Sequence, residues 1–179
     1  RMIIQNLEKA NIKHPSSPSK IASNVLGNYG RIFAEYVYLK KFRNNELKKY
    51  VSIDGLDHLK KLKKHNKKAV FVSGHFNNFE LMAMEIEKAG IDLATIYRPL
   101  NNIFLNKTME QIRKENICKN QIKKGRAGSR EIIKYLTEGK SIALMIDQRV
   151  REGEKVNFFN NLATTTTIPA QLVKKYNCE

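Results

Sequence analysis

The 179-residue chain is predicted to form an α/β domain with a mostly parallel central sheet flanked by helices. Short apolar runs at 69–73, 92–97 and 141–146 have the length and composition of buried strands. Segments with helical periodicity lie between them, and this alternation is typical of strand–helix–strand units. Helical patterning over 1–47 predicts a preface that packs on the sheet. We therefore expect one domain over residues 1–179.

The N-terminal third is expected to be mostly helical. A short amphipathic segment over 2–10 precedes a Pro/Ser break, and a serine of this break caps a long helix over about 19–42. A short strand is predicted at 50–53, and a lysine-rich helix follows at 56–65.

Helices and loops connect the later strands. Helices are predicted at 78–88, closed by Gly90, at 102–116, at 129–138, and after Pro169, which suits the first turn of a helix. A basic loop over 123–128 precedes the third of these helices.

Composition limits the function classes. There are 33 Lys and Arg against 17 Asp and Glu, and the net charge of +16 implies an anionic partner. Nucleic acid, an acidic protein and membrane phosphates all qualify, as does a merely solvated cationic surface. Cys118 and Cys178 have no CxxC spacing, which favours a reduced compartment. The four histidines lack metal-ligand spacing, so no metal is expected.

Two further observations concern nucleic acid and membranes. Aromatic residues do not alternate with the basic run, and no nucleic-acid motif occurs. Nucleic acid is therefore not the expected partner. A non-catalytic basic module that binds nucleic acid or an anionic surface stays an alternative. The sequence has no apolar run of 18 residues. Because the chain opens on Arg1 and stops just after a helix-like stretch, we expect truncation at both ends, which leaves a missing membrane anchor open.

The most informative feature is Gly74-His75-Phe76-Asn77-Asn78-Phe79-Glu80, directly after the strand at 69–73. His75 is placed at the carboxyl end of a strand, where open α/β sheets bind ligands. Glu80, five residues later, is close enough to fold back onto the imidazole. A carboxylate on one ring nitrogen leaves the other to take a proton from a hydroxyl. This is a serine-hydrolase triad without its serine, so a substrate hydroxyl is expected in that place. A solvated histidine near a helix is the alternative.

Several motifs in one order resemble a known family. After the His75 element come Tyr97-Arg98-Pro99-Leu100-Asn101-Asn102, Gly139-Lys140-Ser141, Met145-Ile146-Asp147-Gln148 and Val156-Asn157-Phe158-Phe159-Asn160. The chain resembles the bacterial lipid A biosynthesis acyltransferases, the late lauroyl/myristoyl transferases of the lysophospholipid-acyltransferase superfamily. The resemblance covers essentially the whole sequence. Asn77 and Phe79 replace the Gly and Trp of the family's HxGxWE form, so the turn is expected to differ.

The resemblance implies an O-acyltransferase at the cytoplasmic face of the bacterial inner membrane, peripheral or anchored by a segment outside this chain. Such enzymes move a fatty acyl group from acyl-carrier protein onto a hydroxyl of an anionic, phosphorylated lipid A precursor. The implied partners are the carrier protein, that lipid and the inner membrane surface. No cofactor is implied beyond the acyl donor.

Carried over by motif, His75 is the general base and Glu80 its orienting partner. The residues expected to contact the substrate are Asn78, Arg98, Arg113, Arg126 and Asp147. Backbone N–H groups at the start of the helix at 78–88, Arg98 or Arg113 would stabilise the oxyanion, and the sequence does not choose among them. The basic stretch over 113–130 suits lipid phosphates or an acidic carrier protein.

Two alternatives stay within or near this family. One is a superfamily enzyme that acylates a glycerophosphate or another glycolipid. The other is a catalytically inactive fragment.

Overall fold

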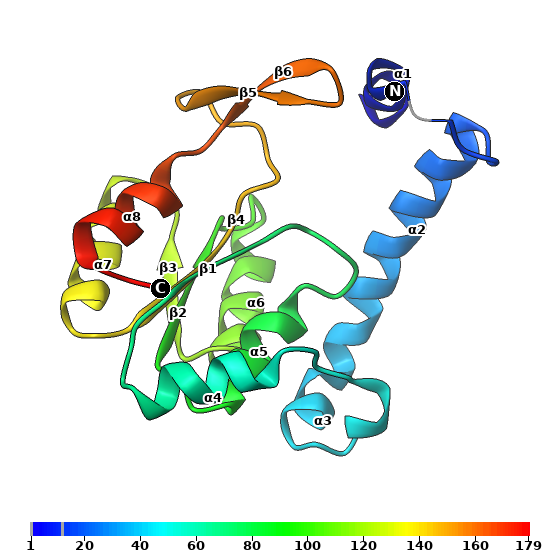
Figure 1. Ribbon diagram of the computed structural model, residues 1–179. Helices are drawn as coiled ribbons and strands as arrows, with labels where there is room; N and C mark the ends of the chain where they lie inside the picture. The colour runs from blue at the N-terminus through cyan, green and yellow to red at the C-terminus, as the bar shows by residue number, and fades with distance from the viewer. Residues whose placement is uncertain (1, 12) are drawn as a thin grey trace.

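A four-stranded parallel sheet forms the centre of the molecule in the computed structural model, which describes residues 2–11 and 13–179 (Figure 1). The strand order is β1-β4-β2-β3. The strands are β1 (Val70–Ser73), β2 (Leu93–Tyr97), β3 (Asn120–Lys123) and β4 (Ser141–Met145). The predicted α/β class is confirmed, and three of the four strands lie where the apolar runs predicted them.

Helices cover one face of the sheet with a large apolar cluster. They are α3 (Leu39–Arg43), α4 (Leu56–Lys64), α5 (Glu80–Lys88) and α6 (Ile103–Asn116). Met84 of α5 and Leu93 of β2 are fully buried in this cluster, together with Leu39 of α3. Burial of each such side chain contributes about 1.5–3 kcal/mol. α3, in the helical preface, thus packs on the α/β core.

The other face is covered by α7 (Arg126–Thr137) and α8 (Ile168–Tyr176). Leu136 of α7 and Leu172 of α8 pack with Ile142 and Leu144 of β4 in a second apolar cluster. β4 lies between β1 and β2 and is buried along most of its length, which explains its uninterrupted apolar sequence.

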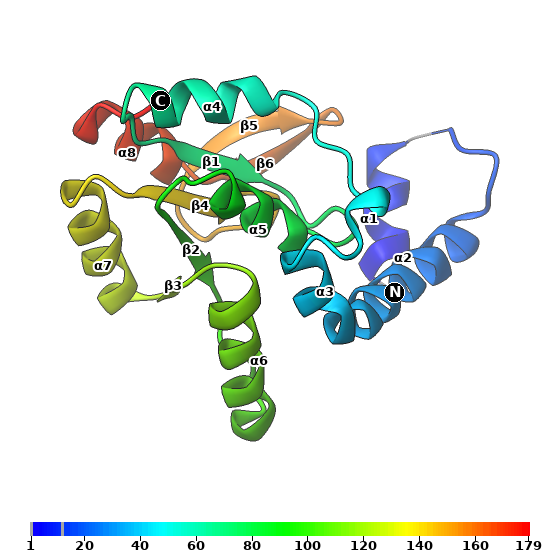
Figure 2. The ribbon, with the colours of Figure 1, turned by 90° about the horizontal axis from the view of Figure 1, so that it is seen from below.

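The N-terminal segment extends away from the sheet. α1 (Met2–Ala10) packs against α2 (Pro18–Glu35), and α2 runs toward α3 (Figures 1 and 2). Ser17 caps α2, since its hydroxyl accepts a hydrogen bond from the Lys20 N–H at 3.3 Å. The predicted single helix over 19–42 is instead divided, because the 3-10 turn η1 (Tyr36–Tyr38) separates α2 from α3.

None of the helices within 2–11 and 13–179 combines the length and the hydropathy that crossing a bilayer requires.

The structure corrects three local predictions. Residues 50–53 are not a strand, because η2 (Lys48–Tyr50) uses the local backbone bonds and no neighbouring strand pairs with this segment. The edge strand β3 precedes the predicted basic loop; only Ile122 is buried in it, so its sequence shows no apolar run. The last residues of that loop belong to α7, which begins at Arg126. Before α8, an unpredicted antiparallel hairpin joins β5 (Glu154–Phe158) to β6 (Asn161–Thr165).

Candidate active site

His75 and Asp147 are brought together by the register of two neighbouring strands. Ser73 at the end of β1 is the parallel partner of Met145 at the end of β4. His75 and Asp147 each follow two residues later, so both leave the same edge of the sheet at the same height. The carboxyl ends of parallel strands are where open α/β folds bind their ligands.

Asp147 holds His75 by two hydrogen bonds. The backbone N–H of His75 donates to Asp147 Oδ2 at 2.7 Å, and His75 Nδ1 lies 2.8 Å from Asp147 Oδ1. The imidazole also makes an edge-to-face contact with Phe79, with ring centroids 4.9 Å apart. The orientation of the ring is thereby fixed, with Nδ1 engaged and Nε2 left for other chemistry.

The glycine before His75 has a steric reason. A Cβ at Gly74 would lie 3.2 Å from Asp147 Oδ2 and would also meet the ring of Phe76. A side chain at this position would require the Phe76 ring to move and the Asp147 carboxylate to shift slightly away from the backbone.

Electrostatics keep Asp147 ionised. Partial burial opposes its ionisation, but the hydrogen bonds from the His75 backbone and ring outweigh this and hold the pKa of Asp147 below its usual value. An ionised carboxylate on Nδ1 stabilises the imidazolium that forms when Nε2 takes a proton.

Glu80 makes a different set of contacts. It is buried at the start of α5, where its Oε1 accepts hydrogen bonds from Arg113 Nε at 2.9 Å and from a terminal nitrogen of Arg113 at 2.6 Å. The hydroxyl of Tyr36 also donates to Oε1, and Arg113 in turn donates to that hydroxyl at 3.1 Å. Burial and the neighbouring Glu80 carboxylate raise the pKa of Tyr36, so this hydroxyl stays protonated.

The structure therefore departs from the pairing that the sequence suggested. Glu80 was expected to orient His75, and Asp147 to contact substrate; instead Asp147 binds the imidazole and Glu80 binds Arg113 and Tyr36. The reason is geometric. The strand register places Asp147 beside His75, whereas Glu80, in the first turn of α5, reaches a cation from the last turn of α6.

The loop between His75 and Glu80 is hydrogen-bonded to α2. Asn78 donates from Nδ2 to Glu35 Oε2 at 2.6 Å, and its buried Oδ1 has no partner in the part of the chain that the structure describes. Asn77 has a left-handed backbone with φ of 40°, a conformation that asparagine tolerates. Asn78 is thus held by the helical preface. Neighbouring Glu35 and Tyr36, to which the sequence analysis gave no role in the site, thus bind Asn78 and Glu80, respectively.

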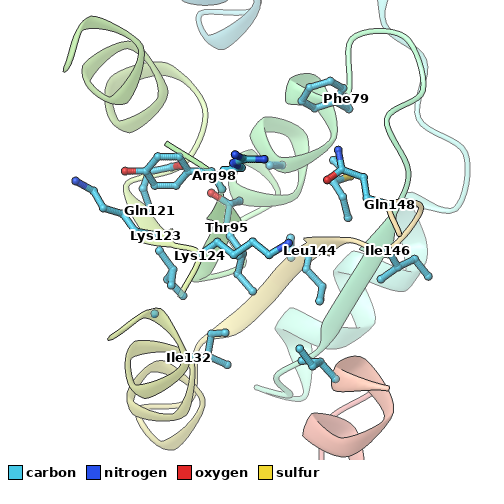
Figure 3. A pocket seen from close by; sticks show the side chains of 18 of the residues that line it. Phe79, Thr95, Arg98, Gln121, Lys123, Lys124, Ile132, Leu144, Ile146 and Gln148 are labelled. Atoms are coloured by element: carbon cyan, nitrogen blue, oxygen red, sulfur yellow. The ribbon is translucent and has the colours of Figure 1, made fainter. Parts of the chain in front are cut away.

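A cavity of about 380 Å³ opens beside His75, within the range of small-molecule sites. Glu80, Arg98 and Arg113 also line it. Figure 3 shows the Lys124 side chain reaching into the cavity, with Arg98 and Gln148 toward one side and Ile132 toward the other. The lining combines cations, among them Arg98 and Lys124, with a set of apolar side chains: Ile96, Ile122, Ile132, Leu144, Ile146 and Ile168.

Three of the five predicted substrate contacts do not line this cavity, and one of them, Asp147, is bound to His75. Arg126 is exposed at the first residue of α7 and does not line the cavity, and neither does Asn78. Among the described residues, no group of three or more His, Cys, Asp or Glu side chains is arranged to hold a metal ion.

A group of polar side chains around the Glu110 carboxylate holds the rim of the cavity in place. The hydroxyl of Tyr97 donates to Glu110 Oε1 at 2.5 Å, Asn106 donates to the same oxygen at 2.7 Å, and Lys123 lies 3.2 Å from it. These contacts, led by the Tyr97 hydrogen bond, lower the pKa of Glu110 to about 2. The cluster joins the ends of β2 and β3 to α6.

Glu110→Gln is expected to reduce stability in a pH-dependent way. Because the pKa of Glu110 falls from 4.5 to about 2 on folding, its contribution is present above pH 4.5 and is lost as the pH falls toward 2. The contribution is on the order of 2–3 kcal/mol. Chemical denaturation at pH 7 and pH 3 should show a loss for the variant that shrinks at the lower pH. Glu115→Gln, on the exposed side of α6, is the matched control. Equal losses at both pH values would contradict this assignment.

A parallel α/β sheet has a histidine–aspartate pair at its carboxyl edge, beside a cavity lined by cations and apolar side chains. This arrangement is typical of an α/β enzyme. The chain belongs to the family described as bacterial lipid A biosynthesis acyltransferase, whose sequence model matches residues 6–179. Membership of this family implies an acyltransferase of lipid A biosynthesis. No curated protein matches the chain.

Proposed function

We propose that the protein transfers a fatty acyl chain from acyl-carrier protein to a hydroxyl of a phosphorylated lipid A precursor. The observation that carries the proposal is the His75–Asp147 pair at the cavity of a chain in this family. Family membership supplies the reaction class. The residues supply a general base, cations that suit phosphate groups and apolar side chains that suit an acyl chain.

In this mechanism His75 is the general base. Asp147 accepts a hydrogen bond from Nδ1–H, so that Nε2 is the nitrogen that takes the proton of the substrate hydroxyl. The hydroxyl oxygen then attacks the thioester carbonyl and forms a tetrahedral oxyanion. When this intermediate collapses, the carbon–sulfur bond breaks and the imidazolium returns the proton to the departing thiolate. The products are an ester and the free thiol of the carrier.

Among the cationic side chains at the cavity, Arg98 is the one best placed to bind the anionic groups of the substrates or of the intermediate. Arg113 is already engaged by the buried Glu80, whereas Arg98 forms no ion pair with the carboxylates that the structure describes. Arg98 and Lys124 both line the cavity. A phosphate of the acceptor or the oxyanion itself would bind there, since cations of this kind stabilise developing negative charge. The apolar side chains that line the cavity would hold the acyl chain.

The partners follow from the surface charge. Carrier protein is acidic, and Arg126 and Arg130 are exposed at the start of α7, next to Lys124 at the rim of the cavity. We assign this surface to the carrier. With a membrane lipid as the acceptor, we propose that the enzyme works at the cytoplasmic face of the inner membrane, either peripherally or through an anchor elsewhere in the protein. No cofactor and no nucleic acid take part in this proposal.

Product mass spectrometry tests the function. Purified protein is given acyl-carrier-protein thioesters with a lipid A precursor, a lysophospholipid or a glycolipid as acceptor. The proposal predicts a new ester on the lipid A precursor and release of carrier thiol in equal amount. An ester on another acceptor alone would replace the substrate, and no product on any acceptor would overturn the activity.

Arg98→Ala is expected to raise KM for the phosphorylated acceptor by roughly tenfold, because a hydrogen bond to a charged group is worth about 1.5–3 kcal/mol. The value of kcat should change less. Arg126→Ala removes the same charge from a position outside the cavity and is the matched control. It should leave the acceptor KM unchanged and raise only the KM for the carrier. An equal acceptor KM for Arg98→Ala and the wild type would remove Arg98 from this role.

A further inference from the structure

The β5–β6 hairpin is exposed to an unusual degree. Every residue of β5 is exposed, and the hairpin forms its own two-stranded sheet at one end of the molecule (Figure 1). An isolated two-stranded hairpin is marginally stable in water. Even so, this one presents Phe158, Phe159 and Leu162 with 62%, 50% and 73% of their surfaces accessible.

The turn of the hairpin places its aromatic residues at a conformational cost. Phe159 and Asn160 connect the strands with φ of 48° and 58°, the left-handed pair of a type I′ turn. Asparagine and glycine suit this conformation, whereas a bulky residue is destabilised there by about 1–2 kcal/mol. Phe159 nevertheless occupies it and contacts Phe158 edge to face at 4.6 Å between centroids. A strained Phe159, exposed together with its neighbour Phe158, indicates a function outside the folding of this chain.

The hairpin is rooted at the active site. It follows β4 and Asp147, and its two ends pass through Val150 and Thr166, both of which line the cavity. Its base is held closely, because any side chain at Gly153 would clash with the backbone carbonyl of Thr165. Near the tip, Asn161 Nδ2 donates to the Lys9 carbonyl of α1 at 2.9 Å. The base of the hairpin is thus held at the cavity, and its tip contacts α1.

We propose that the tip of the hairpin, Phe158 and Phe159 with Leu162, inserts into the interface of an anionic phospholipid bilayer and holds the cavity at the membrane surface. The inference rests on the proposed function, in which the acceptor is a membrane lipid. Aromatic side chains concentrate at the headgroup level of membranes. Exposed Arg149, Arg151 and Lys155 lie in or next to the hairpin, where each cation near an anionic surface adds about tenfold or less to binding.

Lipid is the partner that these contacts favour. An acidic carrier protein would be recognised by cations, and these do not account for an aromatic pair held at the very tip. The overall charge of +16 suits an anionic membrane as well.

The chain contains no tryptophan, so a single introduced tryptophan reports on one site. Phe158→Trp places the probe at the tip. Tyr50→Trp, at an exposed aromatic position in η2 between α3 and α4, is the control at the opposite end of the molecule (Figure 1). With vesicles of phosphatidylglycerol and phosphatidylethanolamine, emission from the tip probe should shift to shorter wavelength and be quenched by brominated acyl chains. The control probe should do neither.

A second variant separates binding from folding. Phe159→Asn removes an aromatic ring and suits the left-handed turn, so it should raise the thermal midpoint while lowering vesicle partitioning by about tenfold. Unchanged partitioning would overturn the proposal. So would a tip probe that responds to carrier protein alone, or to protein concentration without vesicles. Phe159→Asn should retain activity on acceptor in detergent micelles. If wild type and variant are both inactive there, the proposed reaction is wrong. The tryptophan probe still tests membrane insertion in that case.

Discussion

His75→Ala is expected to lower the acyl-transfer rate by about 10²- to 10⁴-fold, the usual contribution of a positioned general base. An alcohol is a weak nucleophile at neutral pH, and the described structure places one imidazole, held by Asp147, at the cavity. Because the ring is partly exposed and packs mainly on Phe79, its removal should leave the fold intact. Single-turnover transfer from a labelled carrier thioester measures the rate, and circular dichroism checks the fold.

Asp147→Asn separates the charge of the partner from its shape. The amide has nearly the same size, but it no longer stabilises an imidazolium. We expect a large loss of rate that a higher donor concentration does not restore. Near wild-type turnover in His75→Ala would remove the general-base assignment. Full activity in Asp147→Asn would leave His75 acting without its observed partner.

The position of His75 was predictable because local sequence determines it. A buried apolar strand, a glycine and a histidine followed by an amphipathic helix define a strand end without knowledge of the other strands. The same holds for β2, β4 and the helices between them. In contrast, β3 escaped prediction because it is an edge strand with one buried side chain, and the hairpin because Phe159-Asn160 lacks the glycine typical of such a turn.

The partner of His75 was not predictable from local sequence. Asp147 is 72 residues away from His75, and only the strand order β1-β4-β2-β3 makes β4 the neighbour of β1. Distance along the sequence favours the carboxylate five residues after His75 over one in another strand. One signal was present, since Asp147 directly follows the apolar run at 141–146, and strand ends of a parallel sheet share one edge.

Glu80→Ala is expected to destabilise the protein by about 3–5 kcal/mol, the cost of leaving one partner of a buried ion pair unpaired. The side chains of Arg113 and Glu80 are only 15% and 8% accessible, so Arg113 would lose its counter-charge away from water. The Tyr36 hydroxyl would lose its acceptor as well. Denaturant unfolding monitored by circular dichroism gives the free energy of unfolding.

A double-mutant cycle identifies the source of that loss. Arg113→Met alone should also be destabilising, whereas Glu80→Ala combined with Arg113→Met should recover part of the stability, because no buried charge is then left unpaired. Asp57→Ala, which breaks the exposed pair with Lys60, is the control and should cost well under 1 kcal/mol.

The same cycle decides between the two roles considered for Glu80. If Glu80 positions Arg113 and Tyr36, the transfer activity of Glu80→Ala should fall in proportion to its loss of unfolding free energy. Both should recover in part when Glu80→Ala is combined with Arg113→Met. If Glu80 instead orients His75 during turnover, Glu80→Ala would abolish transfer with little change in the free energy of unfolding, and removing Arg113 would restore nothing. Among the described residues, the Glu80 carboxylate accepts its hydrogen bonds from Arg113 and Tyr36, which favours the first outcome.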